Sequence, residues 1–326
     1  MITQIFNSYL TAKLVMMAND MGLLKALEQQ GSITTQEMLS RFNFRQPAAQ
    51  DLLRFLTSQQ VLREEEGHYS LSDTFSREYR QNYGMLYWLL GGYGNVIDES
   101  HAILTGDKRY GKDILRDSRK MAEATSLISA QNTDQYMYEL LHRLDFSLAV
   151  DLGCGSGLRL LQLAEHYPTV RLSGIDISEE CCALARQNIA QNNKSAQINI
   201  VCSSAEDWSE NIAETRTDAG RNLILCFGMF HDLLNIPGCA ERMLQSIRHD
   251  YPAGTYLLIQ DQMRAPVTRV TTDDWVEGFS FVHRLMGQSL YSLDVYTKMM
   301  QEHGFSVKEV LPTLIPENYL LLAELG

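Results

Sequence analysis

The 326-residue sequence has no long apolar run, no CxxC pair and no surplus of basic residues. A membrane-spanning helix needs about 20 mostly apolar residues, whereas the apolar stretches here are short and interrupted by polar residues or glycine. The first residues also lack the basic segment and the small-residue cleavage site of a secretory signal. We therefore expect a cytoplasmic protein with no membrane partner.

The cysteine pattern excludes two further classes of protein. Six cysteines are present, and the one adjacent pair, Cys181-Cys182, lies in a helical pattern. Zinc sites and disulfide frameworks use cysteines at regular short spacings, which are missing here. The sequence predicts reduced thiols and no metal site.

The charge balance argues against a nucleic-acid partner. The formal net charge is −12, whereas nucleic-acid binders present lysine and arginine to the phosphates. Helical patterns from Thr34 and over 47–60 precede two short strand patterns, which is the element order of a winged helix. However, residues 46–59 carry a single arginine, and Glu64–Glu66 form the wing tip. We expect this core to serve packing and dimerisation.

The two parts of the chain have different patterns. Residues 1–143 are mainly helical, and a first helix around Ile5, Tyr9 and Val15 is apolar over much of its circumference. Such a helix must be buried, either in its own core or against a second subunit, and we expect a homodimer joined through the N-terminal helices. From residue 144 to 326, strands and helices alternate, which predicts an α/β doubly wound sheet with an antiparallel strand at its edge.

A glycine-rich loop follows the first strand of this second part. Gly153, Gly155 and Gly157 are spaced G-x-G-x-G, and Asp151 precedes them. A dinucleotide fingerprint has its third glycine one position later, where Leu158 stands, and a phosphate loop has a lysine that is missing here. An acid at this place repels a pyrophosphate but suits a cationic ammonium or sulfonium ligand.

A second acid, Asp176, ends the next strand pattern about twenty residues on. In nucleotide-binding sheets an acid at this position accepts hydrogen bonds from the hydroxyls of an adenosine ribose. The loop, the preceding acid and the second-strand acid together predict a site for an adenosine-containing cation.

These residues resemble the first motif and the ribose-binding acid of the class I S-adenosylmethionine-dependent methyltransferases. The resemblance implies a Rossmann-like fold with S-adenosyl-L-methionine as cofactor. It places the following residues around that cofactor: Asp151, Gly153, Gly155, Gly157, Asp176, Ile177, Ser204, Ala205 and Phe227. The position of the family's acid beside the adenine departs from the pattern: Ser204 and Ala205 are expected at the adenine edge, with Asp207 serving in place of that acid.

The whole chain is similar to the plant and bacterial small-molecule O-methyltransferases, in which a helical, winged-helix-like dimerisation domain precedes the cofactor domain. The resemblance implies that His231 in the segment Phe230-His231-Asp232 is the general base and that Asp261 supports it. Two further positions depart from the family pattern: Leu233 replaces a frequent aromatic residue, and no acid stands near Ser289.

The residue types suit this role. A phenol loses its proton only near pH 10, so a positioned imidazole is a suitable proton acceptor. An acid on the other ring nitrogen would hold the tautomer and stabilise the imidazolium.

A helical pattern over 273–286 carries the expected acceptor wall. Four residues at spacings of three or four share one face: Trp275, Phe279, His283 and Met286. They suit a flat aromatic or polyketide-like acceptor, and packing within the core explains the Trp and the Phe equally well.

The sequence thus predicts an S-adenosylmethionine-dependent O-methyltransferase of specialised metabolism acting on a hydroxylated aromatic or polyketide-like small molecule. Three alternatives stay open. The acceptor atom could be a heteroaromatic nitrogen. The chain could bind the cofactor without transferring its methyl group, as a pericyclase, decarboxylase or hydroxylase. It could also be a ligand-sensing DNA-binding regulator.

Overall fold

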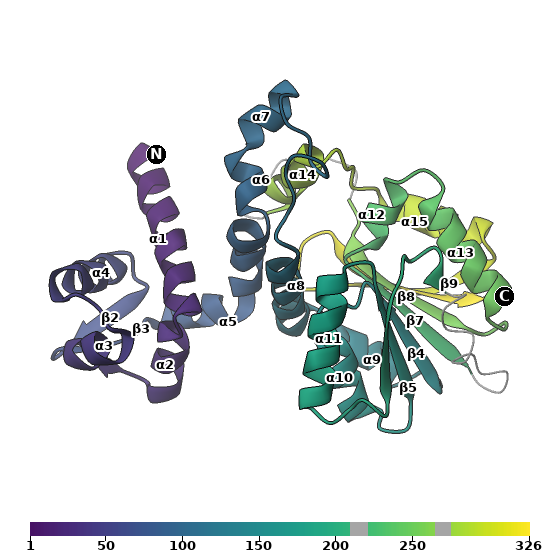
Figure 1. The fold of residues 1–326 in the computed structure, drawn as a ribbon, viewed down its shortest axis with the longest axis horizontal. Helices are drawn as coiled ribbons and strands as arrows, with labels where there is room; N and C mark the ends of the chain where they lie inside the picture. Colours follow the sequence, from purple (N-terminus) through teal and green to yellow (C-terminus); the bar gives the residue numbers. More distant parts are fainter. Residues whose placement is uncertain (209–220, 265–274) are drawn as a thin grey trace. The chain divides into compact units, whose positions relative to one another are not determined.

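The computed structural model describes residues 1–208, 221–264 and 275–326 (Figure 1). The chain forms two compact units, Met1–Leu90 and Gly91–Gly326. Four helices that precede the large sheet therefore belong to the second unit. The domain boundary predicted between residues 143 and 144 lies just before the first strand of that sheet, which begins at Leu148.

The first unit has the helix–helix–hairpin order expected from its sequence. Its elements are α1 (Ile2–Asp20), α2 (Leu23–Gln30), β1 (Ile33–Thr34), α3 (Thr35–Phe42), α4 (Gln46–Ser58), β2 (Leu62–Glu65), β3 (His68–Leu71) and α5 (Asp73–Tyr87). Thr34 and Glu37 form a reciprocal capping box at the start of α3. The strands form a three-stranded antiparallel sheet in the order β1-β3-β2.

Short helices begin the second unit. A π-helical turn, η1 (Trp88–Gly92), spans the division between the units and is followed by α6 (Gly94–Asp98), α7 (Ser100–Thr105), α8 (Ser118–Asn132) and α9 (Asp134–Leu141). Gly92 packs against α8 so closely that a Cβ there would lie 2.3 Å from Met121 Sδ. This contact explains a glycine at the end of η1.

The second unit contains a seven-stranded sheet in the order β6-β5-β4-β7-β8-β10-β9. Its strands are β4 (Leu148–Leu152), β5 (Arg171–Asp176), β6 (Ile198–Cys202), β7 (Asn222–Phe227), β8 (Tyr256–Gln262), β9 (Phe305–Pro312) and β10 (Asn318–Leu325). Strands β4 to β8 pair in parallel, and β10 pairs antiparallel with both β8 and β9. The antiparallel strand β10 is thus one position in from the edge, because it lies between β8 and the edge strand β9.

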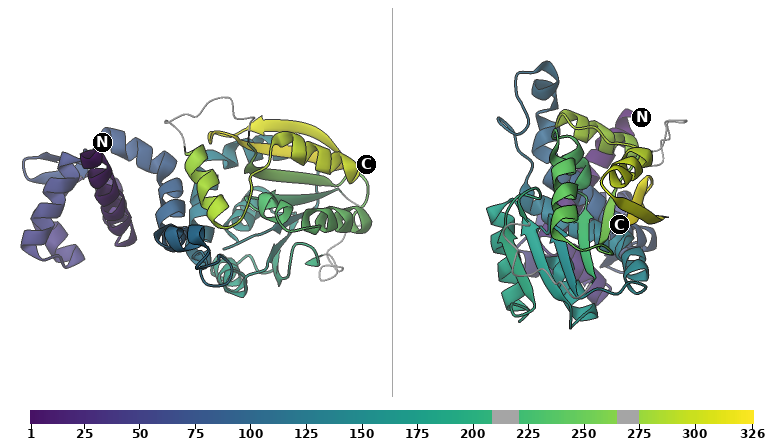
Figure 2. Two further views of the ribbon diagram at one scale, coloured as in Figure 1. Left: turned by 90° about the horizontal axis from the view of Figure 1, so that it is seen from above. Right: turned by 90° about the vertical axis from the view of Figure 1, so that its right-hand side faces the viewer.

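Helices cover both faces of this sheet (Figures 1 and 2). They are α9, α10 (Leu158–His166), α11 (Glu179–Gln191), α12 (Phe230–Leu234), α13 (Cys239–Asp250) and α15 (Leu293–Glu302), whereas α14 (Val276–Leu285) contacts α6 and α7. Alternate residues of β4 face opposite cores: Val150 packs with residues of α13 and α15, whereas Ala149 packs with residues of α9, α10 and α11. The α/β doubly wound fold predicted from the alternating pattern is confirmed.

Within the described residues, the structure contains no helix that is long and apolar enough to cross a membrane.

Candidate active site

The glycine loop is folded back onto the end of β5. The amides of Gly153 and Cys154 both donate to the Ile175 carbonyl, at 2.8 and 2.9 Å. Gly153 and Gly157 have φ values of +73° and +74°, which side chains rarely adopt. A Cβ at Gly153 would also lie 2.9 Å from Met229 Sδ. The loop conformation therefore requires glycine.

Asp176 links the two strand ends. Its Oδ2 accepts a hydrogen bond from the Gly155 amide at 2.9 Å, and its Oδ1 accepts one from the Ser178 amide at 2.8 Å. The carboxylate also lines the cavity described below. Asp176 thus orders the glycine loop and presents acceptor oxygens to a bound molecule.

Asp151 pairs with a side chain of this chain and does not line the cavity described below. Its side chain is fully buried, and Arg159 Nη1 donates to both carboxylate oxygens at 3.2 and 3.3 Å. Burial raises the pKa of Asp151, and the nearby Arg159 charge opposes that rise. The guanidinium of Arg159 in turn lies 4.1 Å from the Phe227 ring centre. The sequence predicted that the negative charge of Asp151 would face a cationic ligand, but Arg159 of the protein compensates that charge.

A cavity of about 350 Å³ opens at the carboxyl ends of the strands, within the size range of small-molecule sites. Most of the predicted cofactor residues line it: Gly153, Gly155, Asp176, Ile177, Ser204, Ala205 and Phe227. Asp151 and Gly157 do not. Gly157 has another role, because a Cβ there would lie 3.1 Å from Ala185 Cβ where α10 meets α11.

Asp207 was expected as the acid beside the adenine, but Glu206 and not Asp207 lines this cavity. Asp207 instead accepts a hydrogen bond from Ser204 Oγ at 2.9 Å. Glu206 accepts a hydrogen bond from Cys239 Sγ at 2.8 Å and pairs with Arg242. The chemistry of the wall fits an adenosine: Ile177, Leu233 and Ile236 supply an apolar surface, and Asp176 supplies oxygens for ribose hydroxyls.

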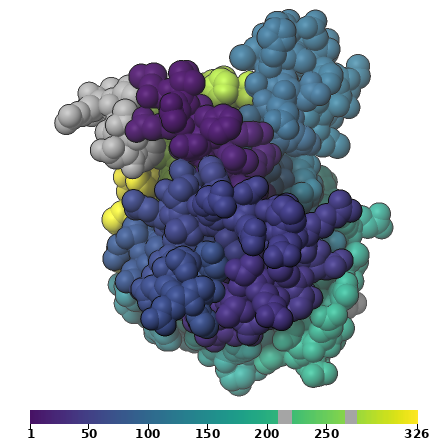
Figure 3. All heavy atoms as spheres, turned by 90° about the vertical axis from the view of Figure 1, so that its left-hand side faces the viewer, coloured from purple at the N-terminus to yellow at the C-terminus, as the bar shows by residue number. Residues whose placement is uncertain are grey.

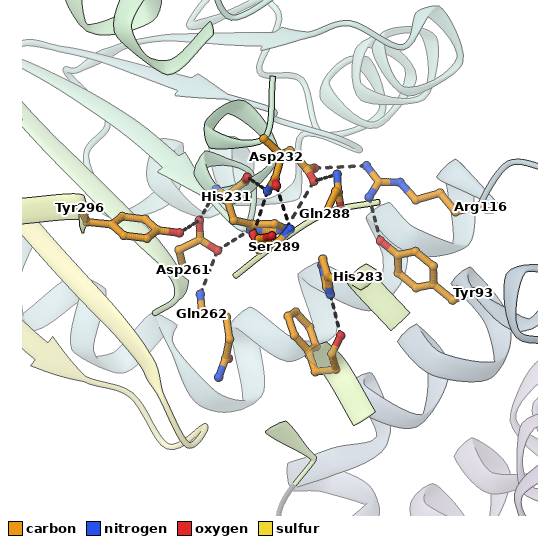
Figure 4. Close-up of polar contacts among 12 residues, drawn as sticks. Tyr93, Arg116, His231, Asp232, Asp261, Gln262, His283, Gln288, Ser289 and Tyr296 are labelled. Carbon is orange, nitrogen blue, oxygen red and sulfur yellow. Dashed lines mark hydrogen bonds and ion pairs between the residues drawn. The ribbon is translucent and has the colours of Figure 1, made fainter. Parts of the chain in front are cut away.

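A buried histidine–aspartate pair lies at the ends of β7 and β8 (Figure 4). His231 Nδ1 is 2.6 Å from Asp261 Oδ1, and the His231 amide donates to Asp261 Oδ2 at 2.7 Å. The Tyr296 hydroxyl and the Gln262 amide also donate to this carboxylate. With Nδ1 donating to Asp261, Nε2 is the nitrogen left for proton exchange.

Asp232 connects this pair to the cavity wall. Its Oδ1 lies 3.5 Å from His231 Nε2 and accepts a hydrogen bond from Gln288 Nε2. Its Oδ2 lies 3.8 Å from Arg116 Nη2, and Arg116 Nη1 donates to the Tyr93 hydroxyl at 2.8 Å. Asp232 and Arg116 line the cavity, whereas His231 lies directly behind Asp232 (Figure 4).

The two buried histidines have opposite pKa shifts. Burial alone would lower the pKa of His231, but the charges of Asp261 and Asp232 outweigh it and raise the pKa to about 9. Burial, together with the charge of His231, lowers the pKa of His283. The two rings meet edge to face with centroids 4.9 Å apart. The two neighbouring imidazoles therefore differ in proton affinity, and His231 holds a proton more tightly than His283 does.

The predicted acceptor wall is only partly assembled around this pair. His283 is buried, and its Nδ1 lies 2.8 Å from the Phe279 carbonyl, which leaves Nε2 as an acceptor. The Phe279 and His283 rings are 4.2 Å apart. Trp275 and Met286 lie at the two caps of α14. None of the four lines the 350 Å³ cavity, and the first residues of the predicted helix over 273–286 lie outside the described part of the chain.

Sequence reasoning missed Arg116, Tyr93 and Gln288, as well as the bridging position of Asp232. Arg116 and Tyr93 precede the sheet in a region without any recognisable motif. Near Ser289, where the family pattern has an acid, Asn235 instead exchanges two hydrogen bonds with the Ser289 backbone, both of 2.8 Å. The adjacent Gln288 donates a hydrogen bond to Asp232, which in turn contacts His231.

The comparisons with known proteins agree with this geometry. A family model described as a methyltransferase domain matches residues 149–250. The chain therefore carries a methyltransferase domain.

Two curated relatives extend over nearly the whole chain. It is 26% identical to methyltransferase ungE' of Aspergillus campestris, over 93% of this chain and 90% of that protein. It is 23% identical to the indolepyruvate C-methyltransferase of Streptomyces griseus, over 99% of this chain and 94% of that protein.

A solved structure shares the two-domain fold. The methyltransferase CalO1 of calicheamicin biosynthesis, in its S-adenosylhomocysteine-bound form, superimposes with a TM-score of 0.64 at 15% identity, over 100% of this chain and 97% of that one. The chain is thus an S-adenosylmethionine-dependent methyltransferase.

Proposed function

We propose that this methyltransferase acts on a small molecule whose nucleophilic atom is formed by loss of a proton to His231. The observation that carries the proposal is the buried His231–Asp261 pair directly behind Asp232, a residue of the cavity wall. A base held by an acid on its far nitrogen is the arrangement that proton transfer requires.

The cofactor supplies an activated methyl group, and the glycine loop, Asp176, Ile177, Ser204, Ala205 and Phe227 would hold it. Asp261 holds the Nδ1–H tautomer of His231 and stabilises the imidazolium formed when Nε2 takes a proton. Phe279 and His283 would stand on the acceptor side. Asp151 would act on the loop through Arg159.

The raised pKa of His231 suits an acidic hydroxyl acceptor. At about 9 it lies close to the pKa of a phenol, near 10, so the proton passes between groups of similar affinity. This match supports O-methylation of a hydroxylated aromatic or polyketide-like compound of specialised metabolism, and CalO1 is named as a methyltransferase in calicheamicin biosynthesis.

C-methylation at a carbon next to a carbonyl is a second candidate. The relative from Streptomyces griseus is named as a C-methyltransferase of an indolepyruvate. A carbon acid of that kind also becomes nucleophilic by losing a proton, so the same His231–Asp261 pair would serve it. The two candidates share the base and differ in the atom that receives the methyl group.

The variant His231→Asn tests the shared step. Purified wild type and variant are incubated with S-adenosylmethionine and a panel of phenols and arylpyruvates, and products are identified by mass spectrometry and NMR. We expect kcat to fall by about 10²- to 10⁴-fold while the Kd for S-adenosylhomocysteine stays within about twofold. An unchanged kcat would contradict the role of His231. The carbon or oxygen position of the methyl group in the product decides between the two candidates.

We also infer that α1 mediates a homodimer. Four large side chains of this helix are exposed: Ile2, Ile5, Phe6 and Tyr9. Figure 3 shows the face on which α1, in dark purple, lies at the surface. An apolar stripe of this size is typical of a surface that a second copy covers. Phe6→Glu should convert a dimer into a monomer in light scattering, whereas Glu64→Lys at the wing should not.

A further inference from the structure

One basic side chain stands on the cavity wall among the described residues, and it is Arg116. The other charged groups on that wall are the acids Asp176, Glu206 and Asp232. The Arg116 side chain is partly buried, and removing a guanidinium from water carries a cost, so its place on this wall calls for a function.

The contacts of Arg116 leave much of its binding capacity unused. A guanidinium has five N–H donors. Its Nη1 donates to the Tyr93 hydroxyl at 2.8 Å, while the 3.8 Å separation of Nη2 from Asp232 Oδ2 is too long for a hydrogen bond. The other N–H groups have no hydrogen-bond partner among the residues that the structure describes. The side chain is therefore fixed in place with donors to spare.

Two neighbours hold this geometry. Tyr93 is buried, and burial raises its pKa to about 12, so its hydroxyl is neutral and accepts from Arg116. Gln288 donates to Asp232 and keeps that carboxylate between His231 and Arg116. Arg116 is thus held one residue away from the proposed base (Figure 4).

We propose that Arg116 binds a carboxylate of the acceptor and selects acceptors that carry one. The planar fork of a guanidinium matches a carboxylate with two parallel hydrogen bonds, which gives orientation as well as affinity. Held beside Asp232, such a carboxylate brings the neighbouring carbon or oxygen next to His231. The inference rests on the proposed function and names the class of its acceptor.

Two carboxylates could meet Arg116, that of the acceptor and that of the amino-acid part of the cofactor, and titration calorimetry separates them. The acceptor probes are phenylpyruvate and phenylacetone, two ketones that differ by the carboxylate, added to enzyme saturated with S-adenosylhomocysteine. The cofactor probes are S-adenosylhomocysteine and 5′-methylthioadenosine, which lacks the amino-acid part.

We expect the wild type to bind phenylpyruvate about 10- to 100-fold more tightly than phenylacetone, the range of a charge-assisted hydrogen-bonded pair. Arg116→Gln should remove this preference and leave the Kd for S-adenosylhomocysteine within about twofold. Arg119→Gln is the matched control, because Arg119 pairs with Glu123 on the surface of α8 and does not line the cavity. It should keep the preference.

Three results would overturn the inference. The wild type could bind the two ketones equally or not at all, or Arg116→Gln could keep the preference. Arg116→Gln could also weaken S-adenosylhomocysteine but not 5′-methylthioadenosine, which would assign Arg116 to the cofactor. None of these results touches the proposed function, which fails only if His231→Asn retains activity on the acceptor panel.

Discussion

The cofactor side and the acceptor side of this site are built in different ways. Around the glycine loop, backbone amides and carbonyls make the decisive contacts, as in the bonds of Gly153 and Cys154 to the Ile175 carbonyl. Around His231, the decisive contacts join side chains from three elements and one loop: Asp261, Asp232, Tyr296 and, in the loop, Gln288. Substitutions on the first side should therefore change binding, and those on the second should change turnover.

The largest effect is expected from Asp261→Asn. The amide keeps the shape of the carboxylate but loses the charge that stabilises the His231 imidazolium, so kcat should fall by about 10²- to 10⁴-fold. The Kd for S-adenosylhomocysteine should stay within about twofold. The measurements are steady-state kinetics and titration calorimetry.

A second histidine–aspartate pair provides the control. His249 Nδ1 lies 2.9 Å from Asp250 Oδ1 at the exposed end of α13. Asp250→Asn should leave both constants unchanged. A large loss of cofactor affinity in Asp261→Asn would remove the division between the two sides.

The second prediction concerns stability against pH. The folded-state pKa of His231 is raised from 6.5 to about 9. Protonation of His231 therefore stabilises the folded protein fully below pH 6.5, and this stabilisation is lost as the pH rises through 9. The shift corresponds to a free energy of unfolding on the order of 3 kcal/mol. Relative to His231→Gln, the wild type should lose that advantage between pH 6 and pH 10 in urea denaturation. A difference between the two proteins that does not change with pH would contradict the raised pKa.

The cofactor side of the molecule was predictable because its signals are local. The glycine spacing after a strand pattern predicted a strand followed by a tight loop, and the structure has this loop between β4 and α10. A loop that needs positive φ values leaves its mark in glycine residues next to one another in sequence.

The acceptor side was less predictable because its contacts span long distances in sequence. Gln288 reaches Asp232 across 56 residues, and Arg116 comes from a segment with no motif. The partner of Asp151 was missed for a related reason: an arginine eight residues further on carries no sign that its side chain turns back under the loop. Pairings of this kind are decided by tertiary packing, which residue spacing does not encode.

The third prediction tests the backbone side directly. In Gly153→Ala the new Cβ meets Met229 Sδ at a position where φ is +73°, which costs about 1 to 3 kcal/mol of strain. Relief of that strain would displace the loop, so the Kd for S-adenosylhomocysteine should rise about tenfold or more. Gly254→Ala is the control, since φ is +85° there and the nearest atom is 3.8 Å away. It should lower the melting temperature without changing that Kd.

The smallest effect is expected from Tyr296→Phe. The hydroxyl donates to Asp261 Oδ2 at 3.0 Å, but the His231 and Gln262 amides still donate to that carboxylate in the variant. The loss of one hydrogen bond of about 1 kcal/mol should lower kcat only a few-fold. With one donor fewer, Asp261 interacts more strongly with His231. The pKa of His231 should therefore rise, and the acid limb of the pH profile of kcat/KM should move to higher pH. Tyr319→Phe, which alters the same core from β10, should leave that limb in place. A limb that moves to lower pH in Tyr296→Phe would mean that Tyr296 supports the imidazolium by a route other than Asp261.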